Sequence, residues 1–142
     1  MAHRILIATS RYYEHISREL EAGVEEALAG EDVVTETIEV PGAFEVPGII
    51  AMAADSARYD GYVALGCVIR GETSHYDYVC GESARGLMTL AVERRLAIGY
   101  GILTVESEAQ AIARADRKQK NKGRDAALAC LSMLKLRKKF VG

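Results

Sequence analysis

The segment Tyr62–Ile69 is apolar at nearly every position, and it constrains the fold of this chain more than any other stretch. Strands with one solvated face alternate apolar and polar residues, whereas a parallel strand that helices cover on both faces is apolar throughout. The segment is too short to cross a bilayer, which takes about 20 apolar residues in a helix. It therefore predicts a central strand of a parallel sheet.

Strand and helix patterns alternate on both sides of this segment. Three more strands are predicted, at Ile5–Ala8, Val33–Val40 and Tyr100–Val105. The spacing of apolar residues predicts helices at His15–Ala29, from Val46 to Ala53, at Tyr76–Leu96, from Ser107 to Ala115 and, beyond a polar loop at Asp116–Gly123, a final helix with Ala127, Leu128, Leu131 and Leu134 on one side. Strands joined by helical crossovers predict an α/β protein, a three-layer α/β/α sandwich around a four-stranded parallel sheet.

The composition is that of an ordinary globular protein, which we expect to form a single domain over residues 1–142. A formal net charge of −2 favours neither nucleic acid nor membrane as a partner. Cys67, Cys80 and Cys130 lack the spacing of metal ligands, so we expect no metal. No secretory signal is visible, and the odd number of cysteines then predicts free thiols in the cytoplasm.

The run Arg70–Tyr78 follows the central strand directly and concentrates chemically useful side chains. In open α/β sheets, ligands bind just beyond the carboxyl ends of the strands. Gly71 lets a phosphate approach the backbone, and Thr73 and Ser74 are suited to cap a helix whose amino end attracts anions. Histidine side chains exchange protons near neutral pH, so His75 adds an acid/base to the same loop.

Four motifs together resemble the 6,7-dimethyl-8-ribityllumazine synthase family. They are Pro41–Pro47, Gly66–Val79, Gly101–Thr104 and Asn121–Gly123. The resemblance covers nearly the whole chain and keeps the order and spacing of the motifs. Gly66–Val79 is highly specific, whereas Asn121–Gly123 alone would be weak.

The resemblance implies a flavodoxin-like fold and an enzyme of the penultimate step of riboflavin biosynthesis. The expected transferase condenses 5-amino-6-(D-ribitylamino)uracil with 3,4-dihydroxy-2-butanone 4-phosphate, releases phosphate and water, and needs no cofactor. A homopentamer or a multiple of pentamers is implied, with active sites between subunits, and an association with riboflavin synthase is left open. The charged loop Asp116–Lys120 and the lack of an amino-terminal extension favour assemblies smaller than a 60-subunit shell.

His75 resembles the proton-transfer residue of the family. The chemistry needs such a residue, because an amine attacks a ketone, water leaves and phosphate is eliminated. The alternative is a histidine that only caps or packs at the start of a helix. Asp77 is a candidate to orient the imidazole.

Glu72 and Thr73 match the positions that hold the phosphorylated substrate, and Arg114 matches the phosphate-binding arginine. The planar fork of an arginine suits two phosphate oxygens. Because a carboxylate repels phosphate, we expect Glu72 to make its contact through the backbone N–H. Lys122 is a weaker candidate for the same anionic region. Without the resemblance, Arg114 and Lys122 would be interpreted as solvated charges.

Tyr12 matches the aromatic residue that stacks on the pyrimidine, with Tyr13 as a second candidate and simple packing as the alternative. Cys67, Val68 and Ile69 match the strand end that contacts the pyrimidine, largely through backbone groups. Cys67 stands where a hydroxyl residue is frequent, and Tyr13 where a small polar residue often follows. Both departures from the family pattern concern the affinity of the site for the pyrimidine ring.

Ala43, Phe44 and Glu45 match the turn that binds the ribityl chain. Glu45 can accept hydrogen bonds from hydroxyl groups, although a carboxylate is also favoured at a helix start for its charge alone. Tyr100 matches an aromatic or apolar position that reaches the heterocycle from a neighbouring subunit.

Three functions remain as hypotheses at this point. The first is the transferase, which His75 and Arg114 favour. The second is a flavin- or lumazine-binding protein with little turnover, for which Tyr12 and Tyr13 leave room. The third is a flavodoxin-like signalling module, suggested by fold alone and disfavoured by the lack of an acidic cluster after the first strand.

Overall fold

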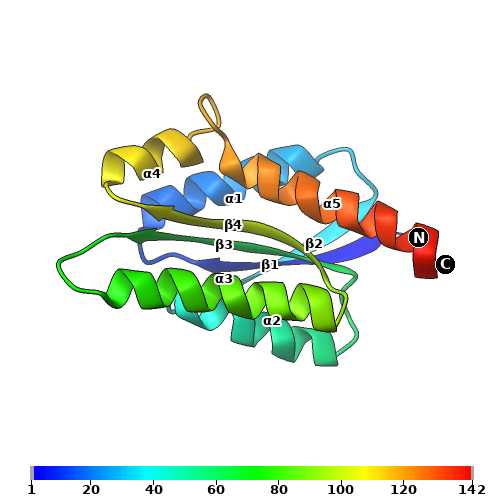
Figure 1. The fold of residues 1–142 in the computed structure, drawn as a ribbon. Helices are drawn as coiled ribbons and strands as arrows, with labels where there is room; N and C mark the ends of the chain where they lie inside the picture. Colours follow the sequence, from blue (N-terminus) through cyan, green and yellow to red (C-terminus); the bar gives the residue numbers. More distant parts are fainter. Residues whose placement is uncertain (1, 142) are drawn as a thin grey trace.

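A four-stranded parallel sheet runs through the centre of the computed structural model, which describes residues 2–141 (Figure 1). Its strands are β1 (His3–Ser10), β2 (Val33–Val40), β3 (Gly61–Ile69) and β4 (Ala97–Val105), in the order β2-β1-β3-β4. All three strand pairings are parallel, so the carboxyl ends of the strands lie along one edge of the sheet. β3 is buried from Gly61 to Cys67, which confirms the central strand predicted from its apolar sequence.

Helices cover both faces of the sheet (Figure 1). One face carries α1 (Glu14–Leu28), α4 (Glu108–Ala115) and α5 (Lys122–Val141), and the other carries the 3-10 turn η1 (Ala43–Glu45), α2 (Val46–Asp55) and α3 (His75–Glu93). Alternate residues of β1 enter two separate cores: Ile5 and Ile7 pack with α1 and α5, and Leu6 and Ala8 pack with η1 and α2. This architecture confirms the predicted α/β fold.

Small residues let α5 approach the sheet closely. A Cβ atom on Gly99 of β4 would collide with the carbonyl oxygen of Ala126, and one on Gly61 of β3 would lie 2.7 Å from Cys130 Sγ. At Gly99 the backbone of β4 therefore meets the backbone of α5 directly, and no side chain has room there.

Several predicted boundaries were wrong. β4 begins at Ala97 and not at Tyr100, because Ala97 pairs with Gly61 at the start of β3. β1 is longer at both ends than Ile5–Ala8, and α3 ends at Glu93 rather than at Leu96. α5 begins at Lys122, inside the predicted loop.

One of the four residues predicted to share a side of the last helix lies off its buried surface. Leu128 faces solvent, because the surface of α5 that meets the sheet and α1 passes through Ala127, Cys130, Leu131 and Leu134. Leu128 lies one residue beyond this stripe, about 100° around the helix from Ala127.

Each helix in residues 2–141 is too short or too polar to span a lipid bilayer. Cys67, Cys80 and Cys130 are all free thiols in the structure.

Candidate functional site

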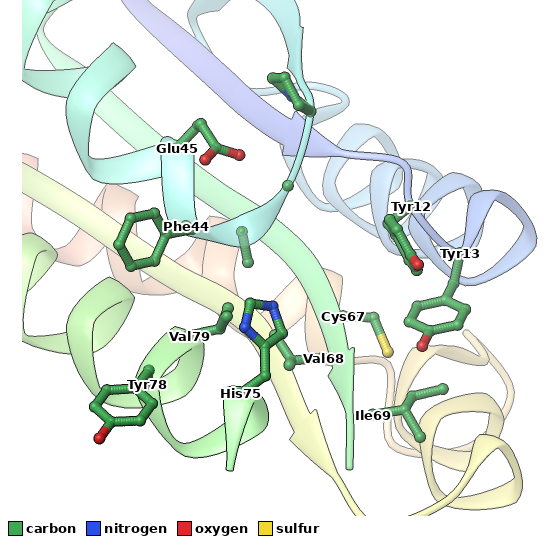
Figure 2. Close-up of a pocket in the computed structure, with 13 residues that line it drawn as sticks. Tyr12, Tyr13, Phe44, Glu45, Cys67, Val68, Ile69, His75, Tyr78 and Val79 are labelled. Carbon is green, nitrogen blue, oxygen red and sulfur yellow. The ribbon is translucent and has the colours of Figure 1, made fainter. Parts of the chain in front are cut away.

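A pocket of about 590 Å³ lies at the carboxyl ends of β1, β2 and β3, where the topology of the sheet predicts a ligand (Figure 2). The loop after β1, the turn from β2 into η1, the last residues of β3 and the first turn of α3 enclose it. The lining residues are Tyr12, Tyr13, Pro41, Gly42, Ala43, Phe44, Glu45, Cys67, Val68, Ile69, His75, Tyr78 and Val79.

Two tyrosines after β1 form one wall of the pocket, beside Cys67 and Ile69 (Figure 2). Their ring centroids lie 5.0 Å apart in an edge-to-face arrangement. Tyr13 is half-buried against the core, and this burial raises the pKa of its phenol. Tyr12 is 75% exposed, so its ring is free to stack on a planar ligand.

An ion-pair network holds the loop that carries these tyrosines. Arg11 donates from Nε and Nη2 to the two carboxylate oxygens of Glu21 in α1, at 2.9 and 2.8 Å. Its Nη1 donates to Glu39 of β2 at 3.3 Å, and Thr9 Oγ1 donates to Glu21 at 3.0 Å. A bidentate, partly buried pair of this kind has a fixed geometry, so the chain leaves β1 in a defined direction toward Tyr12.

The end of β3 provides a second wall. Val68 and Ile69 are half-buried, whereas Cys67 is buried, and burial raises the pKa of the Cys67 thiol to about 12. The thiol is therefore neutral at physiological pH, and it contributes shape rather than a nucleophile. Opposite this wall, η1 places Phe44 and Glu45 at the pocket (Figure 2).

His75 is the first residue of α3, and its imidazole projects into the pocket between η1 and the end of β3 (Figure 2). The backbone N–H of His75 donates to Thr73 Oγ1 at 3.3 Å, whereas the Ser74 side chain makes no capping hydrogen bond in α3. The side chain of Asp77 lies 3.5 Å from Arg70 Nη1, so the hypothesis that Asp77 orients His75 gives way to an Asp77–Arg70 pair.

The pocket gathers Tyr12, Ala43–Glu45, Cys67–Ile69 and His75 from the predicted residues. Glu72 and Thr73 lie in the exposed loop that leads into α3.

Three further predicted residues lie away from the pocket. Tyr100 lies on β4, which is one of the two edge strands of the sheet, and its side chain is 44% exposed. Arg114 lies on α4 and donates from Nη1 to the carbonyl oxygen of Gln110 at 3.1 Å. Lys122 begins α5 and lies 3.4 Å from Asp125.

The pocket also contains Tyr13, the second candidate for stacking, together with four residues that were not among the predicted site residues: Pro41, Gly42, Tyr78 and Val79. Helical spacing could have identified two of them, because residues three and four positions beyond His75 share its side of α3. Within residues 2–141, no cluster of three or more His, Cys, Asp or Glu side chains is arranged to hold a metal ion.

Comparisons with known proteins identify the family. The family model described as 6,7-dimethyl-8-ribityllumazine synthase matches residues 2–138. The chain belongs to the 6,7-dimethyl-8-ribityllumazine synthase family. A protein of that name from Sphingopyxis alaskensis is 56% identical over 140 residues, which is 99% of this chain and 98% of that protein. Proteins of the same name from Novosphingobium aromaticivorans and Methylobacterium radiotolerans are 55% and 53% identical, over 96% and 95% of this chain and 98% and 82% of their own lengths.

Membership of the lumazine synthase family selects among the three functional hypotheses. The chain is an enzyme with lumazine synthase activity in riboflavin biosynthesis. The flavodoxin-like signalling module, which rested on fold alone, is excluded by this membership.

Proposed function

We propose that the pocket binds 5-amino-6-(D-ribitylamino)uracil, that the loop Gly71–Ser74 binds 3,4-dihydroxy-2-butanone 4-phosphate, and that His75 transfers protons between them. The observation that carries this proposal is the position of His75. Its side chain enters an aromatic-walled pocket from the first residue of a long helix, directly after an exposed loop. The product is 6,7-dimethyl-8-ribityllumazine, with release of phosphate and water.

The pyrimidine ring is assigned to the wall formed by Tyr12 and the end of β3. The exposed ring of Tyr12 offers a stacking surface, and the backbone groups of Cys67–Ile69 lie beside it for hydrogen bonds. The ribityl chain is assigned to η1, because the Glu45 carboxylate accepts hydrogen bonds and hydroxyl groups donate them. Ala43 and Phe44 provide the apolar side of the same turn.

The condensation requires several proton transfers at one place. When the amine nitrogen bonds to the ketone carbon, the nitrogen loses a proton and the carbonyl oxygen gains one, which gives a hydroxyl group. This hydroxyl takes up a second proton and leaves as water, while the nitrogen loses its second proton and a C=N bond forms. Elimination of phosphate breaks a C–O bond and removes a proton from the neighbouring carbon. An imidazole donates and accepts protons in turn near neutral pH, so His75 can serve each step.

The phosphate is assigned to the amino end of α3. This helix spans 19 residues, and the exposed residues Glu72 and Thr73 precede it with their backbone N–H groups. A helix amino end attracts anions through its free N–H groups and its dipole. The Glu72 carboxylate has no part in this contact.

We infer that a second copy of the chain completes the site. Tyr100 lies on β4 and Arg114 on α4, the helix that follows β4, and we call this part of the molecule the β4 side. The pocket lies instead at the ends of β1, β2 and β3. Tyr12, Phe44 and Tyr78 leave large apolar surfaces exposed at the pocket, which a neighbour would cover. If each chain covers its neighbour's pocket with its own β4 side, the contact is heterologous and closes into a ring.

A pentamer, or a multiple of pentamers, is the assembly we propose, and Lys122 is a weaker candidate to join Arg114 at the neighbour's phosphate. The loop Asp116–Lys120 is tied to its own chain, since Arg117 Nε donates to Glu19 of α1 at 3.0 Å. Because contacts within its own chain hold this charged loop, we favour assemblies smaller than a 60-subunit shell. The three free thiols support a cytoplasmic location.

Mixing the purified protein with both substrates tests the proposed site. We expect the absorbance of the lumazine chromophore to rise only when both substrates are present. His75→Asn should slow this reaction by about 10²-fold or more, because proton transfer contributes about that much, while ribitylaminouracil still binds. His3→Ala is the matched control, since His3 begins β1 at the opposite end of the sheet. A wild-type rate in His75→Asn would contradict the role of His75.

A further inference from the structure

Arg70, the residue directly after β3, connects three separate segments through its side chain. Its Nε donates to both carboxylate oxygens of Glu106, at 2.9 and 3.0 Å. Its Nη1 lies 3.5 Å from Asp77 Oδ1, and its guanidinium carbon lies 4.3 Å from the centre of the Tyr76 ring. Asp77 and Tyr76 both belong to the first turn of α3, immediately after His75.

Glu106 is itself held in place, so it can act as an anchor for Arg70. The backbone N–H of Glu106 donates to Gln110 Oε1 of α4 at 2.7 Å, and the N–H of Gln110 donates to Ser107 Oγ at 3.2 Å. The backbone N–H of Arg70 also donates to the carbonyl oxygen of Val105 at 3.0 Å, which extends the pairing of β3 and β4. The contacts with Glu106 therefore join the guanidinium to the segment between β4 and α4, and the contacts with Asp77 and Tyr76 join it to the start of α3.

The chain between Arg70 and His75 has little packing of its own. Every residue from Gly71 to Ser74 is exposed, and so is His75. The position of the imidazole consequently depends on how firmly the first turn of α3 is held. Single exposed ion pairs contribute little to stability, so the expected effect of these Arg70 contacts is on local geometry rather than on folding.

We propose that Arg70 is a positioning residue for the condensation. Anchored on Glu106, it holds Tyr76 and Asp77 and thereby keeps the imidazole of His75 over the pocket. The proposal rests on the proton-transfer role proposed for His75. Arg70 itself touches neither substrate.

Steady-state kinetics with both substrates test this role. Arg70→Gln should lower kcat about 10- to 100-fold, because small misplacements of a catalytic group cost that much. The KM for ribitylaminouracil should stay unchanged, since the side-chain contacts of Arg70 are with Glu106, Asp77 and Tyr76 and not with Tyr12 or Cys67–Ile69. Arg70→Lys should recover only part of the rate, because an ammonium supplies neither the planar fork nor the stacking surface.

A double-mutant cycle separates positioning of His75 from other roles. If Arg70 acts through His75, the double variant Arg70→Gln/His75→Asn should be no slower than His75→Asn alone. Glu106→Gln, which removes the charge of the anchor, should show the same lack of additivity and serves if Arg70→Gln folds poorly. Arg85→Gln is the matched control, because Arg85 forms a bidentate pair with Glu82 further along α3.

Three results would overturn the proposal. Additive losses in the double variant would show that Arg70 acts independently of His75. A higher KM for the butanone phosphate with an unchanged kcat would make Arg70 a phosphate ligand. A wild-type rate in Arg70→Gln, with a slow His75→Asn, would remove the positioning role and leave the proposed function intact, whereas a wild-type rate in His75→Asn would overturn both.

Discussion

At the scale of single residues, burial decides the chemistry of Cys67. The thiol lies in the wall of the pocket beside Tyr13, yet burial raises its pKa to about 12. In the unfolded chain the same group titrates near 9. Between these two values the folded protein keeps a proton that the unfolded chain releases, so the free energy of unfolding falls as the pH rises through this window. Below pH 9 the contribution of the neutral thiol is fully present.

We expect Cys67→Ala to weaken this pH dependence. One proton changes the free energy of unfolding by up to about 1.4 kcal/mol per pH unit, and the variant lacks that proton. Urea unfolding at pH 8 and at pH 10.5 measures the difference, and the wild type should lose more stability than the variant. Cys130→Ala is a comparison at a second buried thiol, whose pKa is raised to about 11. Equal losses in the wild type and Cys67→Ala would show that the Cys67 thiol ionises freely in the folded protein.

A local motif is enough to place a side chain at the pocket, although the role of that side chain stays a prediction. His75 was assigned from the sequence that surrounds it, and it does line the pocket. Tyr78 and Val79 were not predicted, although both lie within about one helical turn of His75 and share its side of α3. The ion pair of Asp77 with Arg70 was not predicted, because the sequence does not show that the Arg70 side chain reaches the first turn of α3.

At the scale of elements, the close contact of α5 with β4 requires a residue without a side chain at Gly99. Gly99 faces α5, and any Cβ there meets the carbonyl oxygen of Ala126. Gly99→Ala should therefore lower the free energy of unfolding by about 1–3 kcal/mol, the usual cost of overpacking. Chemical denaturation measures this loss directly.

Gly81→Ala is the matched control for this prediction. Gly81 lies in the interior of α3, and a Cβ there meets no neighbouring atom within 4 Å. Alanine is favoured over glycine in a helix by about 0.5–1 kcal/mol, so this variant should gain stability. A Gly99→Ala variant as stable as the wild type would show that α5 is free to move away from the sheet.

The strands β3 and β4 show which parts of the sheet could be predicted from the sequence and which could not. β3 was recognised because burial on both faces leaves a continuous apolar run. The first residues of β4 were missed because Ala97 and Gly99 are weak strand formers. They are held in a strand by pairing with β3 and by the close approach of α5, neither of which is visible in a local window.

At the scale of the whole molecule, the predicted site divides into two groups that one chain does not bring together. Tyr12, Glu45 and His75 line the pocket, whereas Tyr100 and Arg114 belong to the β4 side. The pattern of residues along the chain could place the first group at the ends of the strands. The second group came only from the resemblance to a family, because strand order and helix packing give no reason to assign these residues to a ligand.

Complementation between two inactive variants tests whether the groups meet across subunits. His75→Ala removes the proton carrier from its own pocket, and Arg114→Ala removes the arginine offered to a neighbour. Co-assembled in equal amounts in a ring, the two variants should place an intact His75 beside an intact Arg114 in about a quarter of the sites. Lumazine formation by the mixture should therefore exceed that of either variant alone.

The control is each variant unfolded and reassembled by itself, with light scattering to measure the size of the particle before each assay. In a cyclic assembly, mixing raises the activity because each site takes His75 from one chain and Arg114 from its neighbour. If His75 and Arg114 served one pocket from the same chain, every chain in the mixture would lack one of them, and mixing would restore nothing. That outcome, or a monomer with full activity, would contradict the shared site and would require the β4 side to have another role.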